Sequence, residues 1–469
     1  MTESQLKLYN LCRQENADNA NIRGELPLEA LSPIKAIENK EGIDLNDDFK
    51  CALKVMDETN KSQLVTGKAG TGKSTLLRHF VKNTKKNVVV CAPTGISALN
   101  VSGQTIHSLF RFPPKMLDYS DVKVSYNANY KSIDTIIIDE ISMVRADIFD
   151  AIDLFMRLNG KDPGKPFGGV QMILFGDLYQ LPPVVEKELG EILHSIYKSP
   201  YFFDANVMKY FSFDVINLTK VYRQTDVDFI NFLDKVRLGN VDEVSLGFIN
   251  SRVNPKPDDE FITLTPTNFV ANIINRGKLS EISSKVHVYN AVITGDFKLE
   301  YPTDSELNLK IDAQVIFVKN DKYGRWVNGT LGKVIECKDG CVDVKINDRF
   351  TVEVGPEEWD KIKYEYNKDK RRVIANTSGR FIQIPLKLAW ALTIHKSQSQ
   401  TLDRIHLDLS SGVWEHGHTY VALSRCRTLN GISLKNKINL KDIKVDARIT
   451  EFLESKLKNI IEKSRRVKK

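Results

Sequence analysis

The sequence predicts an α/β protein in which two parallel-sheet units follow one another, with a small β insert inside the second unit. Short apolar runs alternate with helical patterns up to about residue 220, and strands buried on both faces of a parallel sheet have this continuous apolar character. Similar runs return later in the chain and indicate the second unit. The runs lie at 64–65, 88–92, 136–138, 172–175, 261–264, 405–409 and 432–434.

A stretch of different character separates the runs of the second unit. It alternates apolar with polar residues and is interrupted by Gly, Asn and Asp turns, a pattern typical of a small antiparallel sheet or barrel. The alternating segments lie at 315–318, 334–335, 342–346 and 350–354. We therefore place an insert at 277–385, which divides the second unit into 226–276 and 386–450.

The first unit is expected over 45–225 and begins with a helix that Asn46 caps. That helix has apolar residues at positions i, i+3, i+4 and i+7, namely Phe49, Ala52, Leu53 and Met56. Residues 1–44 are treated as an N-terminal extension of unknown role. Residues 451–469 form a tail that begins as an amphipathic helix and ends in basic residues.

The composition is that of an ordinary globular chain, with 469 residues, 42% hydrophobic and 27% charged. No run approaches the roughly 18 consecutive apolar residues of a membrane span, and the first ten residues lack a secretory apolar core. The six cysteines have no paired CxxC spacing, which argues against a zinc or iron–sulfur site. We expect an intracellular protein without a membrane partner, in the cytoplasm or nucleoid, or in the nucleus if its source is eukaryotic or viral.

The net charge of +7 is weak evidence for a nucleic-acid partner. Residues 456–469 hold seven Lys and Arg against one acid, which is +6 of the +7 and leaves +1 for the rest of the chain. A solvated tail explains this charge, so a positive binding surface would have to come from uneven distribution of the other charges.

Residues 67–74 read Gly-Lys-Ala-Gly-Thr-Gly-Lys-Ser, between an apolar run and a helix-forming stretch. Glycines let the backbone N–H groups of such a loop face a phosphate, Lys73 can reach the β- and γ-phosphates, and the Ser74 hydroxyl can bind Mg²⁺. The sequence therefore predicts a nucleoside triphosphate site, the alternative being a surface turn rich in Gly and Lys. The nucleotide-binding residues assigned to this loop are Gly67, Gly70, Thr71, Gly72, Lys73, Ser74 and Thr75.

Two further segments place polar side chains at the carboxyl ends of predicted strands. Asp139 follows the run at 136–138 and is assigned to the metal, and Glu140 is the candidate base that orients and deprotonates water. The alternative is an Asp-Glu pair that caps the next helix. Gln180 follows the run at 172–175, at the same edge, and is assigned to the γ-phosphate or the attacking water, although its segment could also be only a tight turn.

Two arginines are candidates for stabilising the negative charge that hydrolysis spreads over the γ-phosphate oxygens, because a guanidinium is planar and always charged. They are Arg223 and Arg425. Taken singly, each could be a surface ion-pair partner. If the second unit supplies them across a cleft, hydrolysis depends on closure of that cleft.

These motifs occur in the order found in superfamily-1 helicases, and the chain resembles the petite-integration-frequency (PIF) family of DNA helicases over about residues 45–440. A segment at 147–171, which ends Lys-Pro-Phe-Gly-Gly-Val-Gln, resembles the signature that lies between the acidic and Gln-Leu-Pro-Pro motifs of that family. The other segments that carry the resemblance lie at 92–100, 103–108, 139–140, 176–183, 222–224, 393–398 and 421–425.

The resemblance implies two RecA-like domains and an SH3-like insert, in a monomer that uses ATP and Mg²⁺. It implies 5′-to-3′ translocation on single-stranded DNA with unwinding of forked or tailed duplex, in replication, repair, recombination or telomere maintenance. It also assigns Tyr222 to the adenine and Gln398 to the nucleotide. The residues expected to contact DNA are Pro93, Thr94, Gly95, Thr105, His107, Phe110, Asn268, His395 and Lys396.

Some features depart from the family pattern or stay open. Phe49 stands where many relatives have a glutamine that reads adenine, and Ser399 and His418 stand where Gly and Gln are usual. A loop near 110–130 that begins with Phe110 could form a strand-splitting wedge or could pack on its own domain. Alternative functions are a DNA-stimulated ATPase clamp that separates no strands, a RecD- or Dda-like helicase, and a P-loop kinase, which Glu140 and the two arginines disfavour.

Overall fold

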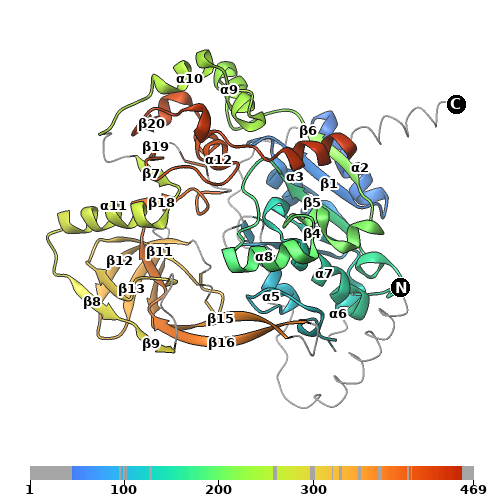
Figure 1. The fold of residues 1–469 in the computed structure, drawn as a ribbon, viewed down its shortest axis with the longest axis horizontal. Coiled ribbons are helices and arrows are strands. Elements are labelled where there is room, and N and C mark those ends of the chain that lie inside the picture. Colours follow the sequence, from blue (N-terminus) through green and yellow to red (C-terminus); the bar gives the residue numbers. More distant parts are fainter. Residues whose placement is uncertain are drawn as a thin grey trace.

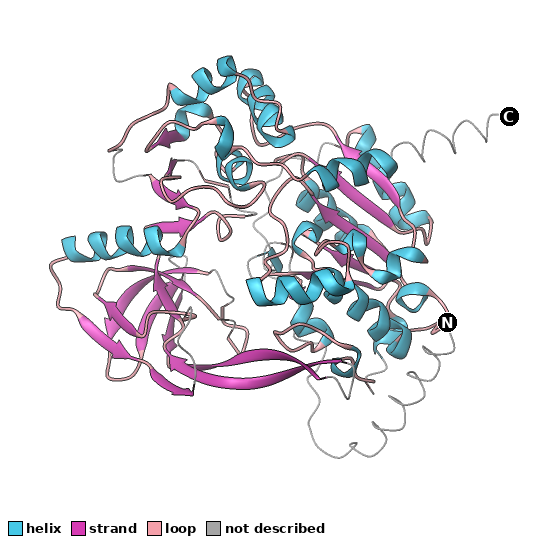
Figure 2. Cartoon of the chain, viewed as in Figure 1, coloured by secondary structure: helices cyan, strands magenta, loops and turns pink. Residues whose placement is uncertain are grey.

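The computed structural model describes residues 45–456, apart from gaps at 95–96, 99–100, 102, 126–128, 257–260, 296–300, 320, 327–329, 347–349, 368–371, 399–400 and 403. The predicted extension at 1–44 and the tail beyond 456 lie outside the described residues. Two parallel sheets and a group of antiparallel strands form the chain (Figures 1 and 2). The α/β fold class with two parallel-sheet units and a β insert is therefore confirmed.

The first unit is a parallel sheet with strand order β3-β2-β4-β5-β1-β6. Its strands are β1 (Gln63–Gly67), β2 (Val88–Ala92), β3 (Gln104–Thr105), β4 (Thr135–Ile138), β5 (Gln171–Gly176) and β6 (Asp214–Leu218). Its helices are α2 (Asp47–Glu58), α3 (Lys73–Asn83), α5 (Ile106–Phe110), α6 (Asn129–Ser132), α7 (Ala146–Asn159) and α8 (Lys187–Ile196).

Both faces of this sheet are covered, as the apolar strands require. Neighbouring residues of β1 point to opposite faces, so that Val65 packs with Phe80 of α3 and Leu64 packs with Phe155 of α7. Leu64 and Val65 are both fully buried, which removes apolar surface from water on both sides of the sheet. The sheet edges β3 and β6 were not expected from the sequence, because β3 has two residues and β6 is partly exposed.

The second unit is a parallel sheet with strand order β18-β7-β19-β20. Its strands are β7 (Ile262–Thr265), β18 (Ala391–Thr393), β19 (Ile405–Leu407) and β20 (Ile432–Leu434). Its helices are α9 (Val227–Leu238), α10 (Glu243–Asn250), α11 (Asn268–Glu281) and α12 (His418–Ser424). The chain leaves this sheet after α11 and returns to it at β18, so the β insert separates neighbouring strands.

The insert contains a five-stranded antiparallel sheet of order β14-β13-β12-β11-β17, with two smaller sheets beside it. Its longest feature is the β15–β16 hairpin, which extends away from the five-stranded sheet (Figure 1). Its strands are β8 (His287–Asn290), β9 (Val292–Gly295), β10 (Glu306–Leu309), β11 (Gln314–Phe317), β12 (Leu331–Cys337), β13 (Val342–Ile346), β14 (Phe350–Val354), β15 (Glu357–Asn367), β16 (Arg372–Gln383) and β17 (Leu386–Leu388).

The end of the described chain returns to the first unit. Residues 447–456 are helical, and Ile449 is fully buried in the core that also holds α7. The Phe452 ring stacks on Phe203 at 4.4 Å between centroids. A segment that follows the last strand of the second sheet thus packs against the first unit. Within the part of the chain that the structure describes, every helix is too short or too polar to span a bilayer.

Candidate active site

The phosphate loop connects β1 to α3 and has the backbone shape that its glycines allow. Gly70 and Gly72 have φ values of 80° and 83°, in the left-handed region that other residues rarely adopt. A Cβ on Gly70 would lie 2.5 Å from Cβ of Arg223, so a larger residue would displace this arginine. Gly72 caps α3 without a side-chain hydrogen bond, and the first N–H groups of a helix are a favourable place for an anion.

Lys73 is the first residue of α3, and its side chain folds back over the loop. Its Nζ donates to the carbonyls of Gly67 at 2.7 Å and Lys68 at 2.9 Å. Burial lowers the pKa of Lys73, and the nearby carboxylates of Asp177 and Glu140 oppose this shift. Two backbone carbonyls therefore hold the ammonium at the loop, and the nearby carboxylates favour its charged form.

Two acids stand at the carboxyl end of β4. Burial raises the pKa of Asp139 to about 7, with the adjacent charge of Glu140 as the second cause. Asp139 Oδ1 accepts a hydrogen bond from the backbone N–H of Glu140 at 3.0 Å. Glu140 has φ of 52°, a left-handed conformation that costs a non-glycine residue about 1–2 kcal/mol, and such strain often marks functional positions.

The oxygen donors at this edge suit Mg²⁺. This ion usually takes one or two protein oxygens together with water and substrate phosphates, rather than a cage of side chains. Ser74 and Asp139 offer one hydroxyl and one carboxylate, and no cluster of three metal-ligating His, Cys, Asp or Glu occurs in the described part of the chain. A buried carboxylate whose proton affinity is raised also gains most from a bound cation.

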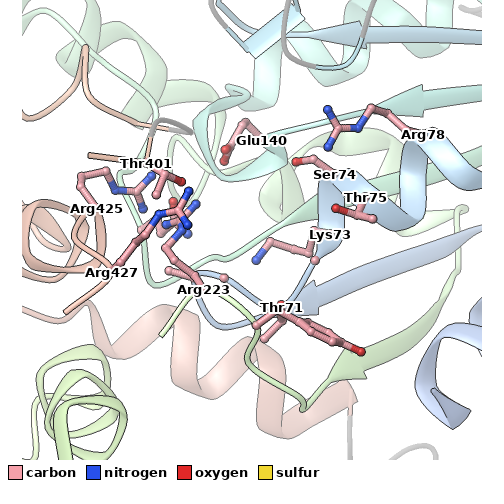
Figure 3. A pocket seen from close by; sticks show the side chains of 15 residues that line it. Thr71, Lys73, Ser74, Thr75, Arg78, Glu140, Arg223, Thr401, Arg425 and Arg427 are labelled. Carbon is pink, nitrogen blue, oxygen red and sulfur yellow. The ribbon is translucent and has the colours of Figure 1, made fainter. Parts of the chain in front are cut away.

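A cavity of about 440 Å³ lies between the two units and brings together most of the residues predicted for catalysis and for nucleotide and metal binding (Figure 3). Arg223, Arg425 and Arg427 face Lys73 and Glu140 across it (Figure 3). The lining residues are Ala69, Gly70, Thr71, Gly72, Lys73, Ser74, Thr75, Arg78, Glu140, Gln180, Tyr222, Arg223, Thr401, Arg425 and Arg427. Gly67, Asp139 and Gln398 do not line the cavity.

Four lining residues were not assigned to the site from the sequence, and one of them, Ala69, lies inside the predicted phosphate loop. Arg78 lies one helical turn after Ser74, a spacing that puts both on one face of α3, and this periodicity could have identified it. Arg427 follows Arg425 by two residues, but sequence spacing alone does not show that both reach the cavity. Thr401 has no sequence signal that we can identify.

Arg223 and Arg425 come from distant parts of the chain and meet at the end of α12. Arg223 Nη1 donates to the Ser424 carbonyl at 2.9 Å, across 201 residues of sequence. Arg425 Nε donates to the Val421 carbonyl at 2.9 Å. Burial lowers the pKa of Arg425 to about 9, with the charge of Arg223 as the second cause. Two neighbouring cations, one buried and one partly buried, favour the binding of a polyanion.

Two buried glutamines lie where the units meet. Gln398, which follows β18, donates from Nε2 to Glu140 Oε2 at 3.1 Å and so connects the second unit to the candidate base. Gln180 lines the cavity and is 4% exposed. A Cβ on Gly417 would lie 2.6 Å from the Gln180 carbonyl oxygen, so α12 approaches this segment closely only because residue 417 is glycine.

Tyr222 lies at the mouth of the cavity and is 39% exposed. Its hydroxyl accepts a hydrogen bond from Asn46 Nδ2 at 2.9 Å, and its ring centroid lies 6.2 Å from that of Phe49. Phe49 itself is buried against the phosphate loop, where its Cζ would lie 3.0 Å from a Cβ on Gly72. An exposed aromatic ring next to a phosphate site can stack on a nucleotide base.

The residues expected to contact DNA follow the carboxyl ends of strands in both units. Pro93 and Thr94 follow β2, Thr105 ends β3, and His107 lies in α5. Asn268 begins α11 and is exposed, and His395 and Lys396 follow β18. Burial and the charge of Lys387 lower the pKa of Lys396 to about 8. Gly95 lies outside the described residues.

Phe110 is a correction. Its side chain is 2% exposed and stacks on Phe112 at 5.5 Å, and Phe155 of α7 contacts both rings. The prediction that Phe110 contacts DNA in a strand-splitting wedge is therefore wrong for this side chain, and the alternative of an apolar segment packed on its own domain holds. Packing against Phe155 removes the apolar surface of these rings from water, which is favourable.

Comparisons with known proteins show the family to which the chain belongs. Residues 45–246 match the family model described as PIF1-like helicase. The ATP-dependent DNA helicase Pif1 of Bdellovibrio bacteriovorus is 31% identical over 424 residues, covering 87% of this chain and 92% of that protein. The ATP-dependent DNA helicase PIF1 of Saccharomyces cerevisiae is 29% identical, covering 90% of this chain and 63% of that protein. The chain thus spans less than two thirds of the yeast relative's length.

Solved structures match the whole fold. A structure of two coordinating Pif1 helicases at forked double-stranded DNA has a TM-score of 0.80 at 34% identity, covering 89% of this chain and 98% of that chain. Bacteroides Pif1 bound to single-stranded DNA has a TM-score of 0.78, and unliganded Bacteroides Pif1 has 0.59, each at 34% identity, 88% of this chain and 97% of that chain. The two parallel sheets are thus tandem RecA-like domains, and their arrangement is closer to the DNA-bound relative.

Proposed function

Because the chain belongs to the PIF1-like helicase family, we propose that it is an ATP-dependent DNA helicase that translocates 5′-to-3′ on single-stranded DNA and unwinds forked or tailed duplex. The observation that carries this proposal is that Arg223 and Arg425 line the same cavity as the phosphate-loop Lys73. The second unit supplies Arg425 and the first supplies Lys73, so the site is complete only when the two units are together.

The roles of the site residues follow from their chemistry. Lys73 binds the β- and γ-phosphates, and Glu140 orients the attacking water and accepts its proton. Arg223 and Arg425 stabilise the charge that develops on the γ-phosphate oxygens. The Mg²⁺ that Ser74 and Asp139 would hold supplies further neutralisation of the phosphates.

Two glutamines connect the state of the nucleotide to the rest of the chain. Gln398 shares Glu140 with the attacking water, and Gln180 lies beside the γ-phosphate position at the start of a rigid Leu-Pro-Pro segment. Tyr222 stacks on the base. Loss of the γ-phosphate therefore changes the contacts of residues on both sides of the cleft, which converts hydrolysis into relative motion of the units.

The strand of DNA is proposed to cross the carboxyl edges of both sheets. Thr94, Thr105 and His107 contact it from the first unit, and His395 and Lys396 from the second. These hydroxyl, imidazole and ammonium groups suit phosphate and sugar, which gives tracking without sequence preference. The greater similarity to the DNA-bound relative than to the unliganded one supports this path, since DNA would bridge the two units.

The domain limits that we propose are 45–225 for the first RecA-like domain and 226–276 with 386–450 for the second. The SH3-like insert then occupies 277–385. The proposed motor is a monomer that acts in replication, repair, recombination or telomere maintenance, inside the cell.

Strand displacement on matched 5′-tailed and 3′-tailed duplexes, with and without ATP, tests the function. We expect ATP-dependent displacement of the 5′-tailed duplex only. Hydrolysis stimulated by single-stranded DNA without displacement of either duplex would instead identify a DNA-stimulated clamp. Displacement of only the 3′-tailed duplex would contradict the polarity while leaving the helicase assignment in place.

A further inference from the structure

A buried network of hydrogen bonds connects the second unit to the phosphate loop. Its residues have no role in the hydrolysis mechanism proposed above. Arg237 of α9 lies 2.8 Å from Asp177, measured from Nη2 to Oδ1. The Tyr420 hydroxyl of α12 donates to Asp177 Oδ2 at 3.0 Å. The same hydroxyl accepts from the backbone N–H of Ala69 at 2.8 Å. These contacts connect Arg237 of α9 to Asp177, Asp177 to Tyr420 of α12, and Tyr420 to Ala69 of the phosphate loop.

The direction of these hydrogen bonds is fixed by the chemistry of the groups. Asp177 is fully buried, and although burial opposes it, Arg237 and Lys73 lower the pKa of this carboxyl, so that it accepts but does not donate. Burial raises the pKa of Tyr420, so its hydroxyl keeps its proton and donates a hydrogen bond to Asp177. The hydroxyl lone pairs then face the Ala69 N–H, a donor that would otherwise be buried without this partner.

The second unit holds the phosphate loop at two successive residues. Lys68, next to Ala69, forms an ion pair with Asp234 of α9, one turn before Arg237. Ala69 packs in the hydrophobic core of the second unit, together with Tyr420. Tyr420 lies near the beginning of α12, and Arg425 directly follows its last residue, Ser424. One short helix therefore connects the contact with the loop to the proposed transition-state arginine.

We propose that Tyr420 is a positioning residue for ATP hydrolysis, which fixes the phosphate loop against α12 while Arg237 holds it there through Asp177. The proposal rests on the proposed ATPase function of the same cavity. Tyr420 touches no phosphate, but it sets the separation between the loop that cradles the phosphates and the helix end that carries Arg425. When reacting groups must be held in a defined geometry, a small change in the distance between them lowers the rate of the chemical step strongly.

The hydrogen bond to Ala69 joins the two units, so it exists only while they are docked. The loop then has its hydrolysis-competent position only in the closed arrangement. A ligand that closes the cleft, such as single-stranded DNA, would thereby raise kcat by ordering the loop, in addition to bringing in the arginines.

The test compares Tyr420→Phe with Tyr201→Phe in the full chain. Tyr201 is a matched control, because its buried hydroxyl also bonds across the sequence, to Asp446 at 2.8 Å, but does not contact the phosphate loop. ATP hydrolysis is measured with a saturating oligo-dT strand and Mg²⁺, and melting temperature is measured for each variant. We expect Tyr420→Phe to lower kcat about tenfold to a hundredfold with KM for ATP within about twofold. Tyr201→Phe is expected to keep kcat within about twofold of the wild type.

Two results would overturn the proposal: kcat of Tyr420→Phe equal to that of the wild type, or an equal loss of kcat in both tyrosine variants. If Tyr420→Phe melts early, Arg237→Lys replaces it, since lysine keeps the charge but not the paired hydrogen bonds to Asp177. It is expected to lower kcat by a smaller factor with KM unchanged, and wild-type kcat there would overturn the proposal. Wild-type protein that hydrolyses no ATP would instead refute the proposed function itself.

Discussion

The two RecA-like domains place a strand, a short connection and a helix in the same order, but the two connections differ. Between β1 and α3 the connection ends in Gly72, which caps the helix with no side-chain hydrogen bond. Between β7 and α11 it ends in Thr267, whose side-chain oxygen accepts a hydrogen bond from the Val270 N–H at 3.2 Å. The first N–H groups of α3 are therefore available to an anion. In α11, by contrast, one of these N–H groups already donates to a side chain of the protein.

This difference shows how two domains of the same fold can contribute different groups to one site. In the proposed function, the first domain binds phosphate at a helix N-terminus where Gly72 provides no side-chain cap. The second domain contributes Arg425 from the end of α12 instead. The polar side chains that follow the strands differ in the same way. Asp139 after β4 is buried without a lysine at ion-pair distance among the described residues, while Asp408 after β19 is paired with Lys435 at 2.8 Å.

The largest expected effect on ATP hydrolysis comes from replacing the first residue of α3, compared with the first residue of α11. Lys73→Ala should reduce ATP hydrolysis about 10³-fold or more, because the ammonium neutralises charge on the phosphates in a buried site. Asn268→Ala, at the same position of α11, should raise the DNA concentration needed for half-maximal stimulation and keep kcat at saturating DNA. DNA-stimulated hydrolysis measured for both variants checks this. Retained turnover in Lys73→Ala would refute the phosphate site.

The second effect concerns what the second domain contributes. Arg425→Ala should lower kcat about 10²-fold, equivalent to about 2.7 kcal/mol, while binding of ATP changes little. Arg448→Ala is the control, since Arg448 pairs with Asp446 and does not line the cavity. Single-turnover hydrolysis together with binding of a fluorescent ATP analogue separates the two steps. An unchanged rate would remove Arg425 from the mechanism.

The third effect concerns how the two acids at strand ends, Asp139 and Asp408, change the stability of the protein with pH. The folded-state pKa of Asp139 is raised from 3.8 to about 7, so the folded state holds a proton that the unfolded state loses above about pH 4. Its contribution to stability is therefore present below about pH 4 and is lost as the pH rises to about 7. In Mg²⁺-free buffer, Asp139→Asn should raise the free energy of unfolding by about 2 kcal/mol at pH 7.5 relative to wild type.

The control for that experiment has the opposite sign. The Lys435 ammonium and the hydrogen bonds of Ser410 lower the pKa of Asp408 although burial opposes them, so its contribution is present at neutral pH and is lost as the pH falls below about 4. Asp408→Asn should therefore destabilise the protein at pH 7.5. Urea unfolding at pH 5 and pH 7.5 measures both variants, and stabilisation by both would contradict the contrast between the acids.

The smallest effect is at the caps. Thr267→Ala should lower the free energy of unfolding by about 1 kcal/mol, because α11 loses its capping hydrogen bond, with KM for ATP unchanged. Thr267→Ser keeps the capping oxygen and should be close to wild type. Urea unfolding and ATPase assays of both variants check this. A raised KM in Thr267→Ala would mean that the second helix also takes part in nucleotide binding.

Much of the fold was predictable because its signals are local. Apolar runs identified β1, β2, β4 and β5, since a strand buried on both faces must be continuously apolar. The edge strands β3 and β6 were missed, because two-residue or partly exposed strands lack that pattern. The assignment of Phe110 to DNA was wrong, since sequence cannot distinguish an apolar loop that meets a ligand from one that packs on Phe155.

The phosphate loop, its lysine and the acidic end of β4 could be located from the amino-acid sequence, because their geometry depends on neighbouring backbone atoms and on the end of a single strand. The folded structure was needed to show that Arg223 and Arg425, about 200 residues apart, meet at one helix end, and that Tyr420 reaches the Ala69 N–H. Those contacts depend on how two separately formed sheets pack against one another. No spacing along the chain encodes that packing.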